Sequence, residues 1–203
     1  AAFSFEAHPG NTTDEHLQAL YEVGFRRISI GVQDFNPLVL AVINRHQTYE
    51  QVKHLTEKAR EIGYTSVNFD IVYGLPLQKV CTIAQTIMKV IAMRPDRIAF
   101  YSYAHVPWIK PGQRRYTEAD LPDSSKKLAM YDTARGALEA AGYVDIGMDH
   151  FALPSDSLFR VAQEGRLHRN FMGYTDTPTS LLIGLGVSAI SDAWTGYIQN
   201  EKV

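Results

Sequence analysis

Residues 66–73 read Ser-Val-Asn-Phe-Asp-Ile-Val-Tyr, between helical patterns at 48–62 and 79–93. Polar and apolar side chains alternate along this stretch, which is typical of a β-strand. One face carries Ser66, Asn68 and Asp70, and the other carries Val67, Phe69 and Ile71. Strands separated by helices are joined by crossover connections, which link parallel strands. The stretch therefore predicts an α/β fold with a parallel sheet.

The same order of strand and helix continues on both sides of this stretch, through about the first 145 residues. Further strands are predicted at 3–8, 27–33, 97–104 and 143–147, and further helices at 13–23 and 124–141. This alternation is compatible with a doubly wound sheet or with a whole or partial (β/α) barrel. Beyond residue 145 the pattern breaks into short pieces, which predict an additional C-terminal segment.

Several predicted helix ends carry recognisable signals. Thr12 with Glu15 and Thr48 with Gln51 have the spacing of a capping box, and Asp123 is placed to cap the last helix. Three helices end in a glycine followed by an aromatic residue, at 24–25, 63–64 and 142–143. Glycine can adopt the left-handed conformation that closes a helix.

One face of the predicted sheet is more polar than is usual for buried parallel strands. It carries Glu6, Gln33 and Asp70 near the carboxyl ends of three strands. An antiparallel sheet with one solvated face would also explain the alternation, but the helical crossovers favour parallel strands. Barrel active sites gather at the carboxyl ends of the strands, so we expect a polar ligand site here.

The composition limits the kinds of partner. The chain has 203 residues with 45% hydrophobic and 21% charged residues, and its formal net charge is −2. This balance predicts one sizeable domain or a domain with an appendage, no nucleic-acid partner and no membrane partner. No apolar run approaches the roughly 18–20 residues that cross a bilayer.

The single cysteine, Cys81, excludes a disulfide framework and cannot by itself ligate a [4Fe-4S] cluster. A reducing, cytoplasmic location is therefore expected. Cys81 falls on a predicted helix, where we expect a buried structural residue.

Short strings spread over the whole chain carry a family resemblance. They are RISIGVQDF at 27–35, INR at 43–45, NFD at 68–70 with YGLP at 73–76, YAH at 103–105, GMDHFA at 147–152, LHRNF at 167–171 with GY at 173–174, and GLGVSAIS at 184–191. In this order they resemble the radical S-adenosylmethionine coproporphyrinogen dehydrogenases, which are the oxygen-independent coproporphyrinogen III oxidases. The CxxxCxxC motif and the glycine-rich second-strand motif of that family are absent.

The resemblance implies a partial (β/α)6 radical-SAM barrel, of which this chain holds about the last four β/α units, plus part of an additional C-terminal segment. Residues 1–120 would form the C-terminal portion of the barrel. Residues 121–203 would supply the final barrel-packing helix and the start of a C-terminal domain. Because residues 1–5 already read as a strand, we expect the chain to come from a longer protein.

The activity implied by the resemblance is the anaerobic conversion of coproporphyrinogen III to protoporphyrinogen IX in haem biosynthesis. S-adenosylmethionine would be cleaved reductively at a [4Fe-4S] cluster, fed by an electron donor such as flavodoxin. The resulting 5′-deoxyadenosyl radical would abstract hydrogen from the substrate propionates. The chain alone is expected to be inactive. Alternatives are a haem chaperone of the same family, and a short binding or interaction module.

Matching positions in these motifs imply six contacts with S-adenosylmethionine: Glu6, Gln33, Arg45, Asp70, Ala104 and Ile190. Glu6 would bind the ribose hydroxyls or the amino group, and Arg45 the methionine carboxylate. Ala104 and Ile190 would contact the region of the adenine. No catalytic residue and no metal ligand in this chain follow from the resemblance.

Other polar and aromatic residues have weaker claims to function. For His8 and His105, hydrogen bonding at the site is favoured over metal binding. Asp149 with His150 could be functional or structural. Two basic clusters could receive propionates, Arg114 with Arg115 and Arg166 with His168 and Arg169, although a solvated loop is favoured for the first. Tyr101, Tyr103 and Trp108 could stack on a tetrapyrrole or pack in the core. Met172 replaces a glutamine found in many members of the family.

Overall fold

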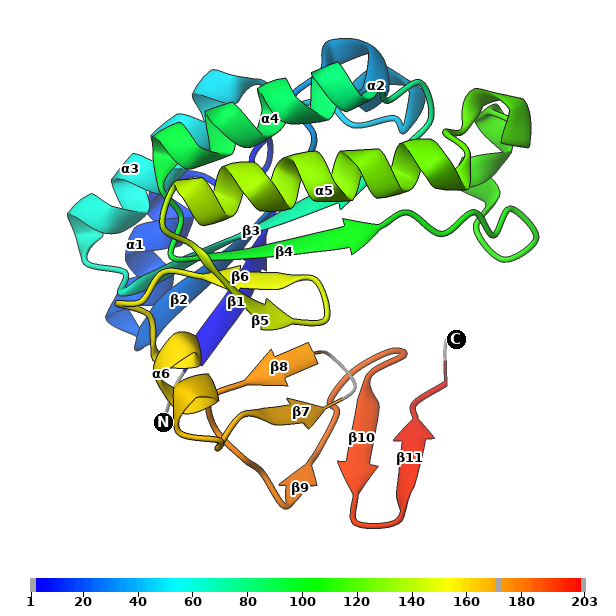
Figure 1. Ribbon diagram of the computed structural model, residues 1–203. Helices are drawn as coiled ribbons and strands as arrows, with labels where there is room; N and C mark the ends of the chain where they lie inside the picture. The colour runs from blue at the N-terminus through cyan, green and yellow to red at the C-terminus, as the bar shows by residue number, and fades with distance from the viewer. Residues whose placement is uncertain (1–2, 171–172, 202–203) are drawn as a thin grey trace. The chain divides into compact units, whose positions relative to one another are not determined.

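A computed structural model describes residues 3–170 and 173–201, and the chain forms two compact units that divide after Asp156. The first unit is built on a six-stranded sheet (Figure 1). In spatial order its strands are β1 (Phe3–Ala7), β2 (Phe25–Gln33), β3 (Ser66–Tyr73), β4 (Arg97–Ser102), β6 (His150–Ala152) and β5 (Val144–Gly147). The pairs β1–β2, β2–β3 and β3–β4 are parallel, as predicted.

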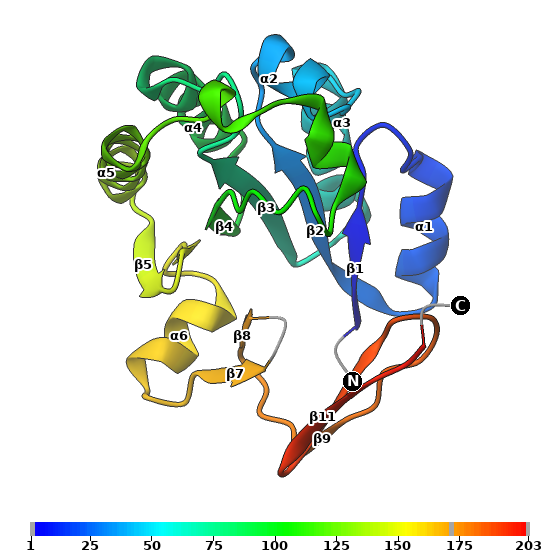
Figure 2. The same cartoon turned by 90° about the vertical axis from the view of Figure 1, so that its right-hand side faces the viewer.

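Helices cover one side of the parallel strands. They are α1 (Asp14–Glu22), α2 (Pro37–Val42), α3 (Tyr49–Ile62), α4 (Val80–Met93) and α5 (Ser124–Ala140), with short 3-10 turns at Pro111–Arg115 and Glu118–Asp120. Figure 2 shows these helices arranged around the outside of a curved sheet. The core between the two layers is apolar, with Phe69, Phe100 and Met130 among its fully buried side chains. The curvature and the outer helices are those of a partial barrel.

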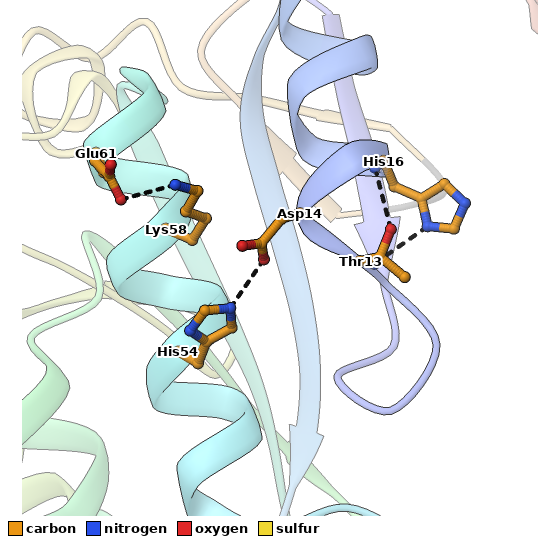
Figure 3. Close-up of polar contacts among 6 residues, drawn as sticks. All are labelled: Thr13, Asp14, His16, His54, Lys58 and Glu61. Atoms are coloured by element: carbon orange, nitrogen blue, oxygen red, sulfur yellow. Dashed lines mark hydrogen bonds and ion pairs between the residues drawn. The ribbon is translucent and has the colours of Figure 1, made fainter.

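The predicted helix ends are largely confirmed, with one error. Thr48 and Gln51 form a capping box, and the Asp123 carboxylate accepts a hydrogen bond from the N–H of Lys126 at 2.8 Å. At α1 the cap is Thr13 rather than Thr12. The N–H of Thr13 donates to Nδ1 of His16 at 3.2 Å, so an imidazole takes the role expected of a glutamate (Figure 3). The helix begins one residue later than predicted.

Polar contacts also link the outer helices to each other. Nε2 of His54 on α3 lies 2.9 Å from Oδ1 of Asp14 on α1, and Lys58 donates to Glu61 within α3 (Figure 3). Both contacts are exposed to solvent, so neither contributes much to stability.

The sheet changes direction at its β4 edge. The predicted strand at 143–147 forms, but it is one arm of a hairpin with β6, and β6 pairs antiparallel with β4. The two residues between the arms, Met148 and Asp149, have φ values of 44° and 65°. Positive φ at both positions is the geometry of a tight hairpin turn, for which Asn-Gly is the usual signal. This sequence lacks that signal, and the hairpin was not predicted.

The second unit follows Asp156 and consists of short elements. They are α6 (Ser157–Gln163), β7 (His168–Asn170), β8 (Gly173–Thr175), β9 (Leu181–Leu182), β10 (Ile190–Ala193) and β11 (Gly196–Gln199). The strands form two small antiparallel sheets, β7–β8 and β11–β10–β9. The sequence-based division after residue 120 concerns the domains of the family and stays a prediction. In the described part of the chain, no helix is long and apolar enough to cross a membrane.

Candidate functional site

A polar layer lies on the face of the sheet opposite the helices. Nδ2 of Asn68 donates to Oγ of Ser29 and to Oδ1 of Asp70, both at 2.9 Å. Oγ of Ser29 donates to Oδ2 of Asp70 at 3.1 Å. Glu6 is the register partner of Ser29 on the neighbouring strand. The polar face predicted from the alternation of side chains is confirmed.

The two carboxylates of this layer are partly removed from water. Burial raises the pKa of Asp70, although the hydrogen bonds from Asn68 and Ser29 work in the opposite direction. Glu6 remains accessible to solvent, yet the surrounding protein reduces its hydration. This desolvation raises the pKa of Glu6, and the nearby carboxylate of Asp70 raises it further. A positively charged or hydroxyl-bearing ligand would relieve both effects.

An aromatic residue borders the acidic layer. Burial raises the pKa of Tyr101 to about 12, and the carboxylates of Asp70 and Glu6 add to the increase. The ring of His150 meets that of Tyr101 edge to face, with 5.8 Å between their centres. The phenol therefore stays neutral at physiological pH and can donate a hydrogen bond at the edge of the site.

The helix α2 delivers Arg45 to the same edge of the sheet. Oδ1 of Asn36 caps the helix at its start, where Pro37 follows. At the other end Asn44 has φ 57°, the N–H of Asn44 bonds to the carbonyl of Ala41, and the N–H of Arg45 bonds to the carbonyl of Leu40 at 2.9 Å. This is a Schellman motif with asparagine in place of the usual glycine. It turns the chain so that Arg45 points back to β2.

The Arg45 side chain lies over a glycine of β2. Its Nη2 donates to the carbonyl oxygen of Gly31, and its Nε donates to Oε1 of Gln47 at 2.8 Å. A Cβ placed on Gly31 would lie 2.9 Å from Nη2 of Arg45 and 3.1 Å from Nε2 of Gln33. The absence of a side chain at Gly31 thus lets the side chains of Gln33 and Arg45 approach each other.

Gln33 itself has a rare backbone conformation. Its φ is 66°, and the N–H of Asp34 donates to the carbonyl of Val32 at 2.8 Å. This is the γ-turn with positive φ at its centre, which is uncommon and strained. Strain of this kind is concentrated at functional sites, where surrounding contacts maintain it.

A cleft of about 590 Å³ opens where these residues meet. Its lining consists of His8, Gln33, Ile43, Asn44, Arg45, Val72, Leu75, Tyr103, Lys110, Pro111, Gly112, Gln113, Arg115 and Tyr116. The hydroxyls of Tyr103 and Tyr116 are 2.5 Å apart, and Nη1 of Arg115 donates to Oδ1 of Asn44 at 2.8 Å. Cationic side chains on both walls suit the cleft to an anionic group.

The six predicted ligand contacts are distributed unevenly. Glu6 and Asp70 share the acidic layer, and Gln33 and Arg45 meet over Gly31. Ala104 is exposed after β4, where its carbonyl accepts a hydrogen bond from Gln113 at 3.1 Å. Ile190 is the first residue of β10, which belongs to the second unit.

The expectation of a buried cysteine is wrong, because Cys81 is exposed on α4. That position lies on the outer surface of the helix, whose inward residues are Ile83 and Ile87. Within 3–170 and 173–201 no group of three potential ligand side chains could hold a metal ion. Met172 lies outside the described residues.

Three buried residues that hold the site together were not predicted from the sequence. Asp34, Gln47 and Gln78 are at most 9% exposed, and each bonds to backbone groups near the cleft. The signal was weak but present for Asp34, a charged residue between the apolar Val32 and Phe35.

Comparison with known proteins agrees with this architecture. Residues 2–90 match the Radical SAM superfamily. This match falls within the first unit. Over 98% of its length it is 45% identical to the oxygen-independent coproporphyrinogen III oxidase of Paracoccus denitrificans, and over its whole length 45% identical to that of Escherichia coli. It spans 44% of each relative, which is less than half.

A solved structure gives the same result for the fold. The structure of coproporphyrinogen III oxidase from Escherichia coli, described as a radical SAM enzyme, superposes with a TM-score of 0.96 at 44% identity. All of this chain and 47% of that chain are covered. The partial radical-SAM barrel predicted from the motifs is therefore confirmed.

The match to the Radical SAM superfamily implies S-adenosylmethionine and a [4Fe-4S] cluster as cofactors. The residues present fit the first of these. Two partly desolvated carboxylates can accept hydrogen bonds from hydroxyl or ammonium groups, and Arg45 can pair with a carboxylate. The cluster ligands are not in this chain, because its only cysteine is Cys81.

Proposed function

We propose that the protein to which this chain belongs is an oxygen-independent coproporphyrinogen III oxidase. It would convert coproporphyrinogen III to protoporphyrinogen IX in haem biosynthesis without oxygen. The observation that carries the proposal is the identity of about 45% along the whole chain to proteins with this name. The cleft lies at the carboxyl ends of the strands, where barrel enzymes act, and this placement supports it.

The proposed ligand of the polar layer and the cleft is S-adenosylmethionine. Glu6 and Asp70 would accept hydrogen bonds from its ribose hydroxyls or amino group. Arg45 would pair with its carboxylate, with Gln33 alongside. Ala104 and Ile190 remain proposed contacts of its adenine region, supported by the motifs that contain them.

When bound and reduced at the cluster, S-adenosylmethionine supplies the radical that takes hydrogen from a substrate propionate. The residues of this chain bind and orient. A ligand held between Asp70 and Arg45 meets opposite charges at its two ends, which fixes its direction in the site. Burial lowers the pKa of Arg45, but this group remains a cation at every physiological pH.

The substrate carries several carboxylates, and the outer wall of the cleft offers a partner for one of them. Lys110 and Arg115 stand on the segment after β4 and line the cleft opposite Arg45. We propose that Arg115, oriented by Asn44, contacts a substrate propionate. The sequence alone favours a solvated loop at Arg115, whereas its place in the lining of the cleft supports the functional alternative.

This chain alone would not catalyse the reaction, since one thiolate cannot hold a four-iron cluster. Reductive cleavage of S-adenosylmethionine also needs an electron donor, and we propose a reducing protein such as flavodoxin. We further propose a cytoplasmic location. A single cysteine is compatible with a reducing compartment.

The test uses the full-length protein, reconstituted with iron and sulfide under anaerobic conditions. It is mixed with reductant, S-adenosylmethionine and coproporphyrinogen III, and the products are separated by chromatography. The expected products are protoporphyrinogen IX and 5′-deoxyadenosine. Stoichiometric haem binding with no porphyrinogen turnover would instead identify the haem chaperone of the same family.

A further inference from the structure

A buried carboxylate stands directly behind the strained turn of β2. The Asp34 side chain is fully buried. Its Oδ1 accepts hydrogen bonds from the N–H groups of Phe35 at 2.6 Å and Asn36 at 3.0 Å, and from the hydroxyl of Thr86 on α4. These contacts tie the end of β2 to the helix layer.

The second oxygen of Asp34 connects to the neighbouring strand. Oδ2 accepts a hydrogen bond at 2.8 Å from Nε2 of Gln78, a residue with 4% exposure. Oε1 of Gln78 accepts from the N–H groups of Gly74 at 2.7 Å and Leu75 at 3.2 Å, and its Nε2 also donates to the carbonyl of Val72 at 3.1 Å. Gln78 thus fixes the turn that follows β3.

The opposite side of the γ-turn is fixed by a third buried side chain. Nε2 of Gln47 donates to the carbonyl of Val32, the same carbonyl that accepts the N–H of Asp34. Oε1 of Gln47 accepts from Arg45. A continuous set of buried hydrogen bonds therefore runs from Arg45 through the γ-turn at Gln33 and on to the turn after β3.

This set of bonds joins the inner walls of the cleft. Gln33 and Arg45 line it from the side of β2, and Val72 and Leu75 line it from the side of β3. Asp34 and Gln78 do not line it. Buried polar groups with all their partners in place rigidify their surroundings, whereas one missing partner is costly.

We propose that Asp34 and Gln78 are positioning residues for cofactor binding, which hold Gln33 in its γ-turn and keep the two walls of the cleft in register. The inference rests on the proposed function, in which Gln33 and Arg45 contact S-adenosylmethionine. Neither Asp34 nor Gln78 touches the ligand. Their effect reaches it through the backbone conformation of Gln33 and through Val72 and Leu75.

The hydrogen-bonding groups of the pair allow a reciprocal test. In Asp34→Asn an amide donor replaces Oδ2 and faces the amide donor of Gln78. If Gln78 turns over, its donor faces the N–H groups of Gly74 and Leu75 instead, so one conflict always remains. In Gln78→Glu two carboxylates face each other. The double variant Asp34→Asn/Gln78→Glu restores the bond between the two side chains in the reverse direction and keeps an acceptor for both N–H groups, but it leaves the carbonyl of Val72 without the donor of Gln78.

The measurements are equilibrium binding of S-adenosylmethionine to the full-length, cluster-loaded protein and amide hydrogen exchange without the ligand. Each single variant should weaken binding about tenfold or more, with kcat at saturating cofactor changed less than about threefold. The double variant should bind more tightly than either single variant, with part of the loss remaining because the carbonyl of Val72 has lost its donor. Exchange at Phe35, Gly74 and Leu75 should quicken in the single variants and slow again in the double variant.

The matched control is Asp156→Asn. Asp156 is a buried carboxylate that accepts from Arg97 at 2.7 Å and from Ser66 at 3.0 Å, next to the opposite ends of β3 and β4. The variant Asp156→Asn should lower the melting temperature of the protein without weakening its binding of S-adenosylmethionine. Thr86→Val removes one hydroxyl bond to Asp34 and provides a milder variant if Asp34→Asn does not fold.

The outcomes separate the two proposals. If Arg45→Ala weakens binding but the single variants bind normally, the positioning role is wrong and the ligand site stands. Equal losses of affinity in Asp34→Asn and Asp156→Asn would also overturn it, because both would then reflect general destabilisation. Unchanged binding in Arg45→Ala would reject the proposed ligand site itself.

Discussion

Arg45 lies across the backbone of Gly31, with Nη2 donating to the carbonyl oxygen of that glycine. A methyl group on Gly31 would come within 2.9 Å of this nitrogen. The contact joins the end of α2 to the middle of the sheet. A substitution at Gly31 can therefore test how the position of Arg45 affects ligand binding, with little change in the stability of the fold.

Gly31→Ala should displace the guanidinium of Arg45 while leaving the fold nearly intact, because the atom that must move is at the end of a flexible side chain. We expect binding of S-adenosylmethionine to the full-length protein to weaken about tenfold, with a change in unfolding free energy below about 1 kcal/mol. Calorimetry and thermal unfolding measure the two quantities.

Gly136→Ala on α5 is the control, since a Cβ there meets no atom within 4 Å. It should stabilise the protein by about 0.5–1 kcal/mol and leave binding unchanged. Normal cofactor affinity in Gly31→Ala would show that the position of Arg45 is unimportant for binding.

Asp70→Ala in the full-length protein should abolish production of 5′-deoxyadenosine while leaving the cluster absorbance intact. The reason is that Asp70 is the central acceptor of the polar layer and lies in the same sheet as Gly31. Chromatography of the nucleoside and the visible spectrum give the two readouts. Undiminished deoxyadenosine would remove Asp70 from the site.

Glu6→Gln should raise the stability of the ligand-free protein slightly at pH 7. The folded state raises the pKa of Glu6. The folded protein therefore binds the proton of Glu6 more tightly than the unfolded protein does. The free energy of unfolding falls as the pH rises from the pKa of Glu6 in the unfolded state to its pKa in the folded state. The glutamine variant lacks this loss, so the difference should persist at neutral pH and vanish below the unfolded pKa.

Thermal unfolding of the parent and of Glu6→Gln between pH 3.5 and 8 tests this sign. A variant that is less stable than the parent at pH 7 would contradict the desolvation of Glu6.

Arg97→Met should destabilise the first unit by about 3–5 kcal/mol, because it leaves the buried carboxylate of Asp156 without its cationic partner. The side chains of Arg97 and Asp156 are only 11% and 3% exposed. Denaturant unfolding measures the loss. Lys126→Met, which removes an exposed ion pair with Asp123, should destabilise the protein far less. Similar losses in the two variants would contradict the burial of the Arg97–Asp156 pair.

Cys81 should react with a maleimide in the folded 203-residue chain at a rate close to that of the denatured chain, because its side chain is exposed. Mass spectrometry follows the single addition, and Cys81→Ser is the blank. Labelling that requires denaturant would restore the buried cysteine expected from the sequence.

The alternation of side chains was sufficient to predict most of the sheet and its polar face. Asn68 and Asp70 follow from a period of two, and the parallel orientation of β1 to β4 follows from the helical crossovers. The hairpin at Met148 and Asp149 could not be predicted, because its turn depends on two positive φ values at residues that do not favour them.

The contacts around Arg45 also could not be predicted from the sequence. Motif resemblance selected the residue, but its approach to Gly31 depends on the left-handed conformation of Asn44 and on the buried amide of Gln47. Both are long-range consequences of packing that leave no periodic pattern. The Asn-Pro pair at 36–37 was a readable signal for the start of α2, which the sequence analysis did not use.

The backbone strain of the γ-turn at Gln33 is carried by a residue that has a side chain. A residue with a Cβ held at a φ of 66° costs about 1 kcal/mol or more in local strain relative to glycine. Gln33→Gly would relieve this strain but would remove the amide that lines the cleft. Glutamine at residue 33 thus places a polar side chain in the cleft at the expense of a strained backbone.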